Sequence, residues 1–208
     1  MCIFLFLKSF AVFAEEDKGH YALVGYDLRT QGDFKAGTYD DEDDEDTLIL
    51  DETVIDFETG FSIGYEYRDA SKNDWGKAFG VMHSLARDAE AVEINGERTK
   101  LSGDVASVAM TTIYAMAIYK WEKFYIPFGI SYNQITYEPP SGFNGDVTSE
   151  GGVGFIFSLG WEIDDRYLIE YGARSSMWTL ISETDTTETD YGFGTLAIAT
   201  LALKIKFY

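Results

Sequence analysis

The sequence predicts an all-β protein, a single eight-stranded antiparallel up-and-down transmembrane β-barrel over residues 19–208. Three observations support this prediction. Eight segments alternate bulky apolar residues with small or polar ones, the connections between them alternate between short and long, and 33 of the 208 residues are aromatic beside 20 glycines. A period of two is typical of strands, because successive side chains of a strand point to opposite faces.

The first three segments differ in clarity. Residues 22–28 alternate apolar side chains with Gly25 and Asp27. Residues 53–68 hold the longest alternation, and we expect the odd-numbered set from Thr53 to Tyr67 on the outer face. Residues 75–86 form the weakest segment, because Lys77 and His83 fall on the same face as Phe79, Val81 and Leu85.

The other five segments span residues 106–118, 124–133, 152–163, 167–177 and 191–207. In each, one face carries large apolar or aromatic side chains and the other is rich in Gly, Ala, Ser or charged residues. For residues 106–118 the larger set runs from Ala106 to Ile118 at even positions. We expect the bulky face of every segment to contact lipid and the other face to line the lumen.

The connections predict which end of the barrel faces outward. Three are tight, around residues 69–74, 120–123 and 164–166. Four are long, and residues 31–52, 87–102, 138–150 and 181–190 together contain 21 acidic and 4 basic side chains. Outer-membrane barrels have short periplasmic turns and longer extracellular loops. We therefore expect nearly all of the net charge of −20 to lie at the cell surface, and this charge excludes nucleic acid as a partner.

The first 14 residues resemble a secretory signal peptide. The segment MCIFLFLKSFAVFA is apolar apart from Lys8 and Ser9, and small residues precede the charged Glu15. It contains Cys2, the only cysteine of the chain. The sequence therefore predicts a signal peptide over residues 1–14 and no disulfide in the barrel domain.

The predicted lumen carries nearly balanced charge. The inward positions hold six acids and five bases, namely Asp27, Arg29, Asp56, Glu58, Glu66, Arg68, Glu162, Glu170, Arg174, Lys204 and Lys206. A soluble lipocalin-like barrel is the structural alternative, but burying unpaired charge in its core would cost several kcal/mol. We expect Glu66 with Arg68, and Glu170 with Arg174, to form ion pairs in the lumen. Tyr and Trp near the strand ends, Tyr125 and Trp161 among them, are expected to form a periplasmic aromatic girdle.

With these features the chain resembles the small outer-membrane β-barrel proteins, which include the OmpA transmembrane domain, OmpX and OmpW. The resemblance rests on the strand count, the FYIPFGI pattern of residues 124–130 and a last strand that ends in aromatic residues. It implies location in the bacterial outer membrane, outer-membrane lipid and lipopolysaccharide as surroundings, and recognition of the C-terminal aromatic strand by the barrel-assembly machinery. A monomer is favoured.

Two groups of residues are candidates for chemistry. Asp40, Asp41, Glu42, Asp43, Asp44, Glu45 and Asp46 form an acidic run that suits weak Ca²⁺ or Mg²⁺ binding, and also a solvated loop that binds nothing. No firm metal site or cofactor is predicted. The resemblance to lipid A deacylases of similar size suggests a His, Ser and acid site, but adjacent His83 and Ser84 point to opposite faces of a strand, and His20 lies at the periplasmic end.

The sequence therefore predicts a non-enzymatic envelope barrel that is structural or acts in surface interaction through its acidic loops. The alternative is a small porin or channel that passes cations or hydrophobic solutes. An interior of eight strands is just wide enough for its own side chains, which favours a closed lumen.

Overall fold

The computed structural model describes residues 18–39, 51–69, 75–143, 145–183 and 189–207. The expected signal peptide, residues 1–14, and the acidic run from Asp40 to Asp46 lie outside the described residues. The strands are β1 (Lys18–Tyr39), β2 (Asp51–Phe57), β3 (Gly60–Asp69), β4 (Trp75–Ile94), β5 (Glu97–Lys100), β6 (Ser107–Trp121), β7 (Phe124–Glu138), β8 (Asp146–Gly151), β9 (Val153–Glu162), β10 (Tyr167–Glu183) and β11 (Thr189–Lys206).

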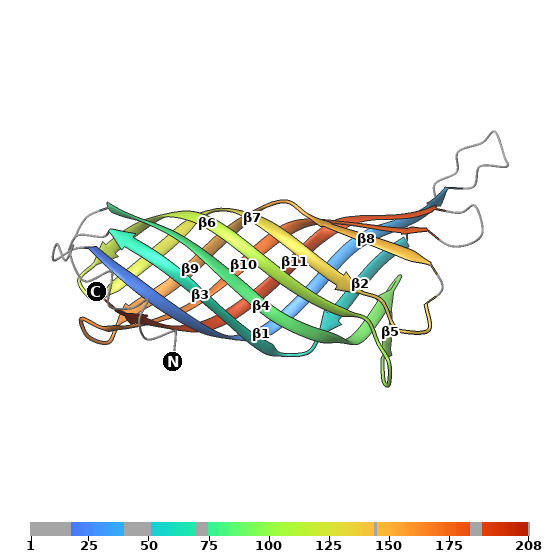
Figure 1. Cartoon of the computed structure of the whole chain (residues 1–208), viewed down its shortest axis with the longest axis horizontal. Helices are drawn as coiled ribbons and strands as arrows, with labels where there is room; N and C mark the ends of the chain where they lie inside the picture. The colour runs from blue at the N-terminus through green and yellow to red at the C-terminus, as the bar shows by residue number, and fades with distance from the viewer. Residues whose placement is uncertain (1–17, 40–50, 70–74, 144, 184–188, 208) are drawn as a thin grey trace, which may run out of the picture.

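These strands form a closed antiparallel barrel with eight positions in its wall (Figure 1). β2 and β3 follow one another between β1 and β4, and β8 and β9 share one position beside β10. β11 pairs with both β10 and β1, which closes the ring. β5 folds back on β4 alone. The predicted eight-stranded up-and-down barrel is confirmed.

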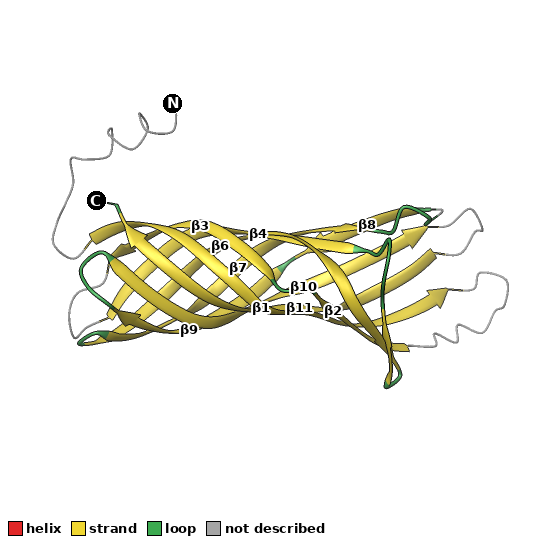
Figure 2. Ribbon diagram, turned by 90° about the horizontal axis from the view of Figure 1, so that it is seen from below, coloured by secondary structure: helices red, strands yellow, loops and turns green. Residues whose placement is uncertain are grey.

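The described ends of the chain lie together. The amide of Phe207 donates to the carbonyl of His20, and the amide of Lys206 donates to the carbonyl of Arg166 in the β9–β10 turn. The short β6–β7 turn, where Glu122 has a φ of 53°, lies at the same end, and the β4–β5 hairpin and β8 lie at the other (Figures 1 and 2). By the topology of known barrels the first end is periplasmic and the second is extracellular.

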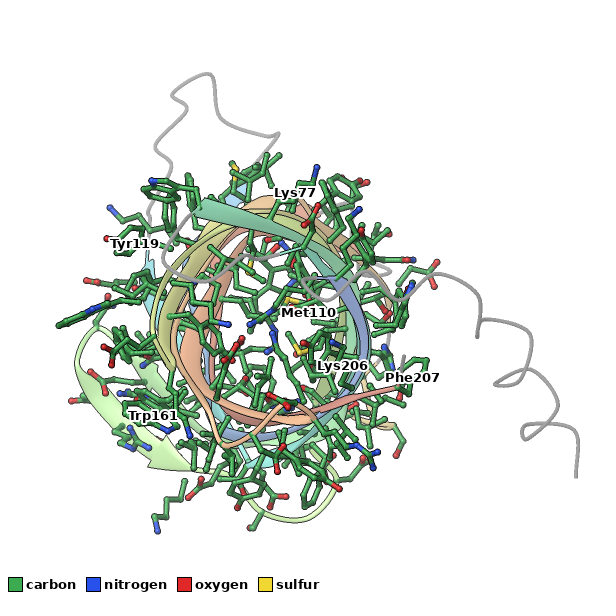
Figure 3. All side chains as sticks on the ribbon, turned by 90° about the vertical axis from the view of Figure 1, so that its left-hand side faces the viewer. Lys77, Met110, Tyr119, Trp161, Lys206 and Phe207 are labelled. Atoms are coloured by element: carbon green, nitrogen blue, oxygen red, sulfur yellow. The ribbon has the colours of Figure 1, made fainter. Side chains whose placement is uncertain are left out.

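The half of the barrel next to the periplasmic end has an apolar outer surface. We call this exposed set the apolar belt: Val24, Tyr26, Leu28, Phe61, Ile63, Tyr65, Phe79, Val81, Leu85, Ile113, Phe128, Ile130, Tyr132, Phe155, Phe157, Leu159, Ile169, Tyr171, Leu201 and Leu203. Nearer the periplasmic end, a second exposed set consists of Trp75, Tyr119, Trp121, Trp161 and Tyr167. Seen along the barrel axis, Tyr119, Trp161 and Phe207 project outside the ring and Met110 lies inside it (Figure 3). So large an exposed apolar surface is the mark of a protein embedded in lipid.

The other half, which we call the outer half, has the opposite arrangement. Its interior holds the outer core, made of Phe57, Ala89, Val108, Met110, Ile135, Trp178, Leu196 and Ile198. Its outside carries exposed polar side chains, among them Arg29, Asp33, Lys35, Glu58, Asp88, Glu90, Gln134, Thr136, Glu138, Thr148 and Glu150. The outer half is thus apolar inside and mainly polar outside, as a water-soluble barrel is, although Phe193 and Ile94 are exposed there.

The reversal is produced partly by irregularities in the strands. The register of β1 shifts between Asp27 and Arg29, that of β4 shifts between Ser84 and Arg87, and two residues outside any strand separate β2 from β3. One extra residue turns every later side chain of a strand to the opposite face. In the membrane the apolar positions of these strands therefore lie on the lipid face, and beyond the bulges they lie on the lumen face.

Several predicted faces are corrected by this arrangement. The side chain of Arg29 is 64% exposed on the outside, not in the lumen. Asp56 and Glu58 also face outward, and Phe57 points inward with 4% exposure. The two residues between β2 and β3 change the phase of the alternation, which explains the differences at Asp56, Phe57 and Glu58. Arg29 is turned outward by the register shift of β1 after Asp27.

The fourth predicted segment is inverted as a whole. Val108, Met110, Tyr114, Met116 and Ile118 are buried in the lumen, because the interior contains apolar layers that a purely polar lumen would lack. The prediction for Tyr125 was wrong for the same reason: the side chain has 0% exposure and lies inside the barrel rather than in the girdle.

The long predicted loops also proved shorter, since β1 extends to Tyr39, β4 to Ile94 and β10 to Glu183. Alternation continues along these extensions, but polar and acidic residues occupy its outer face, and the sequence interpretation took them for loops. Among the residues that the structure describes, no helix is long and apolar enough to cross a membrane.

Candidate functional site in the barrel lumen

The lumen is crossed by two layers of buried polar side chains. The central network consists of Asp27, Thr30, Ser62, Ser84, Arg87, Arg174 and Thr200. The lower network, nearer the periplasmic end, consists of Glu66, Arg68, Tyr114, Glu170 and Lys204. All twelve side chains are inward-facing and buried.

The central network is built around the carboxylate of Asp27 on β1. Its Oδ2 lies 2.7 Å from a guanidinium nitrogen of Arg87 and accepts a 2.5 Å hydrogen bond from the hydroxyl of Ser62. Its Oδ1 accepts a hydrogen bond of 2.5 Å from Thr200 and lies 3.4 Å from Arg174. Side chains from four other strands, β3, β4, β10 and β11, therefore converge on one carboxylate of β1, and the bulge in β4 turns Arg87 inward to reach it.

The lower network is a compact set of two acids and two bases. A guanidinium nitrogen of Arg68 lies 2.7 Å from Glu66 and 2.6 Å from Glu170. The ammonium of Lys204 lies 2.7 Å from Glu66 and 2.8 Å from Glu170. The hydroxyl of Tyr114 donates to Glu66 over 2.9 Å. Each carboxylate is thus shared by both cations.

Aromatic rings cover the guanidinium of Arg68. Its central carbon lies 4.4 Å from the centre of the Tyr125 ring and 5.6 Å from that of Tyr21. Stacking of this kind favours Arg over Lys at the position, because the planar guanidinium binds a carboxylate at its edge and an aromatic ring on its face.

The structure brings together three of the four residues expected to form lumen ion pairs. Glu66, Arg68 and Glu170 meet in the lower network. Arg174 joins the central network instead, where its partner is Asp27, and Glu170 pairs with Arg68 and Lys204. The expected pairing within one strand, between Glu170 and Arg174, is replaced by pairing across the lumen.

Sequence reasoning missed one charged member of the site, Arg87, as well as Tyr114 of the inverted segment. Arg87 falls within the range expected to form an acidic outer loop, yet its side chain is buried with 4% exposure. Regular alternation from Phe79 would place position 87 on the lipid face, which is a poor place for a charge. That conflict is a signal for a bulge, and with it the position turns into the lumen.

The two networks leave little free space inside the barrel. A cavity of about 30 Å³ lies between them, bordered by Tyr114, Glu170, Arg174 and Lys204 and by apolar side chains including Met82 and Met116. Because roughly 10–15 Å³ of such space suffices for one water, the cavity is on the order of two water molecules in size. Beyond the central network the outer core fills the lumen with Trp178, Met110 and their neighbours.

The candidate residues for catalysis do not share a site: His83 faces the outside of the barrel, Ser84 faces the lumen, and His20 contacts Tyr65 at the periplasmic end. His83 is exposed on the outer face, where its Nδ1 lies 2.9 Å from the hydroxyl of Thr111. Ser84 is buried and bonds to Ser62 in the lumen. His20 lies 2.6 Å from the hydroxyl of Tyr65. Within the described ranges no three acidic, His or Cys residues gather as a metal site would require.

Among the residues that the structure describes, β7 loses its ladder to the β8–β9 side in the outer half. β7 pairs with β9 as far as Tyr132 opposite Val153, and the amide of Asn133 bonds to the carbonyl of Gly152. Beyond this point the outer part of β7 pairs with β6, and β8 pairs with β10. We call this break between β7 and β8 the seam; it runs beside Ile135 of the outer core.

Comparison with known proteins supports the fold. No protein-family model matches the sequence, and no curated protein matches it significantly. Among solved structures, the outer membrane protein OprG from Pseudomonas aeruginosa is similar at 11% identity and a TM-score of 0.50, over 90% of this chain and 96% of OprG. The outer membrane protein AlkL, determined in lipid bilayers, is similar at 11% identity and a TM-score of 0.51, over 94% of each chain. The chain therefore has the fold of the small outer-membrane β-barrels, and this likeness, with the apolar belt, supports the predicted outer-membrane location.

Proposed function

We propose that this protein is a non-enzymatic, non-conducting outer-membrane barrel that stabilises the envelope and interacts with partners through its extracellular surface. One observation carries the proposal: two buried polar networks and the outer core fill the lumen along its length. Ion conduction requires a continuous water-filled path, and the cavity of about 30 Å³ between the networks is too small to be part of one.

The surroundings follow from the two halves of the barrel. The apolar belt contacts outer-membrane lipid, while the polar wall of the outer half and the acidic connections face lipopolysaccharide headgroups and the medium. The acidic run from Asp40 to Asp46, which lies outside the described residues, is proposed to be a solvated acidic loop, with weak binding of divalent cations and bridging to lipopolysaccharide phosphates as the alternative. Folding depends on the barrel-assembly machinery, which recognises the last strand, and the assembled barrel is a monomer.

Planar-bilayer recording tests the closed lumen. The protein is refolded, its folding is verified by heat-dependent gel mobility, and a known porin serves as the positive control in the same bilayers. We expect no steady conductance steps from folded protein. Reproducible cation-selective steps would refute the proposal and establish the alternative of a small porin with an acidic vestibule; anion-selective steps would contradict both.

A second candidate function, passage of hydrophobic solutes, is favoured by the seam. Strands β7 and β8 are not joined by a ladder there, and the apolar outer core lies directly behind them. An apolar solute entering from outside would leave at the lower end of the seam, beside Tyr132 of the apolar belt, without crossing the charged networks. Faster uptake of an apolar fluorophore by liposomes that contain the protein, with no ion conductance, would support this candidate over a purely structural role.

A further inference from the structure

The buried charges of the lumen do not balance, and the surplus is local. The lower network contains two carboxylates and two cations. The central network contains one carboxylate, Asp27, and two guanidinium groups, Arg87 and Arg174. Arginine does not lose its proton in proteins, so the central network carries one positive charge that no described residue in it neutralises.

Arg174 is the less well neutralised of the two arginines. Its guanidinium lies 3.4 Å from Asp27, against 2.7 Å for Arg87. One of its terminal nitrogens donates to Thr200 over 2.8 Å, and the other donates to Ser62 over 3.0 Å. Its Nε is buried and has no hydrogen-bond partner among the described residues, although the whole residue is only 3% exposed.

The cavity between the two networks is bordered by this same residue. Its wall includes Arg174, Lys204, Thr200 and Ser158. Glu170 also borders it, but both oxygens of that carboxylate are already held, one by Arg68 and the other by Lys204. The volume of about 30 Å³ accommodates one small ion.

We propose that this cavity binds a single small monovalent anion of the halide class, in practice chloride, with the Nε–H of Arg174 as its principal donor. The ion balances the extra arginine of the central network and supplies the acceptor that the buried N–H lacks. A buried N–H without an acceptor destabilises the folded state, so a halide is expected to stabilise the folded barrel. The inference concerns the closed lumen and does not depend on any surface role of the protein.

Bromide provides a direct test with the wild-type protein. Crystals of the refolded full-length barrel, grown in sodium bromide, are examined for anomalous scattering at the bromine absorption edge. We expect a peak in the cavity at hydrogen-bond distance from Nε of Arg174. A cavity without an anomalous peak, holding water alone, would overturn the proposal.

Thermal unfolding gives a second readout. Midpoints are compared in chloride and in gluconate, an anion too large for the cavity, at equal ionic strength. We expect the midpoint to rise with chloride concentration until the site is saturated, by roughly 2–12 °C in total. Equal midpoints in the two salts would also count against the site.

Three variants separate the site from general salt effects. Arg174→Met removes both the donor and the surplus charge and should abolish the chloride response. Ala202→Val fills the cavity from β11 without changing any charge and should abolish it too, which keeps the test valid if the first variant does not fold. Arg29→Met, at an exposed outer position, should retain it; loss of the response in this control would mean that chloride acts by screening.

Discussion

The lower network permits a quantitative prediction about Arg68. Its side chain is 5% exposed and lies within 2.7 Å of two carboxylates, so Arg68→Met leaves Glu66 and Glu170 to share one cation, Lys204. Removing one partner of a buried ion pair costs about 3–5 kcal/mol, because the remaining charge is uncompensated. We expect a loss of that size in the free energy of unfolding.

A second substitution should recover part of this loss. In Arg68→Met combined with Glu170→Gln, Glu66 and Lys204 remain as one balanced pair at 2.7 Å. The double variant should therefore be more stable than Arg68→Met alone, and the double-mutant cycle should give an interaction free energy of about 1–3 kcal/mol.

Equilibrium urea unfolding in lipid vesicles measures both quantities, with tryptophan fluorescence and gel mobility as independent probes. Arg29→Met is the matched control: the distance from its guanidinium to Asp56 is 3.8 Å, but the side chain is 64% exposed, so its loss should cost no more than about 1 kcal/mol. Arg68→Met and Glu170→Gln would not be coupled through the lower network if Arg68→Met lowered the free energy of unfolding as little as the control does, or if the losses of the two single variants added up to that of the double variant.

Three further predictions use the same assay. A Cβ at Gly154 would collide with a backbone carbonyl oxygen of β10, so Gly154→Ala should prevent or severely weaken folding, whereas Gly142→Ala, with open space around it, should be close to neutral. Trp178→Ala should cost about 3–5 kcal/mol because the ring is 3% exposed in the outer core, and the 67%-exposed Trp121 should prove less sensitive to the same change. Phe155→Arg on the apolar belt should cost about 2–4 kcal/mol in a bilayer, and no cost there would contradict the assignment of this face to lipid.

The fold was predictable from sequence because its main signals are local. From Val153 to Trp161 one face of the strand contacts lipid and the other faces the lumen along the whole length, so the alternation of apolar and small residues has a constant phase. The predicted face is correct there. The closed order of eight wall positions follows from the turn lengths. Neither inference requires knowledge of which strands touch across the lumen.

The candidate site was less predictable because it depends on which face of each strand points inward after a bulge, and on which side chains meet across the lumen. Alternation cannot show that an extra residue before Arg87 turns it inward, or that Arg29 turns outward after a bulge. The partners of Glu170 come from β3 and β11, and no spacing in the chain relates these positions. The large side chains of β6 were placed on the wrong face because apolar residues serve two purposes here, contact with lipid and packing inside the outer core.

The length of the strands has a consequence for recognition at the cell surface. β1 contains 22 residues, which at ordinary strand rise and barrel tilt span about 55 Å, roughly twice the height of about 25 Å that lipid covers. The folded wall therefore stands well clear of the bilayer. An antibody, phage or labelling reagent that approaches the cell meets a rigid curved sheet of Gln134, Thr136 and Glu138 as well as loops. Its epitopes are conformational and vanish when the barrel is unfolded.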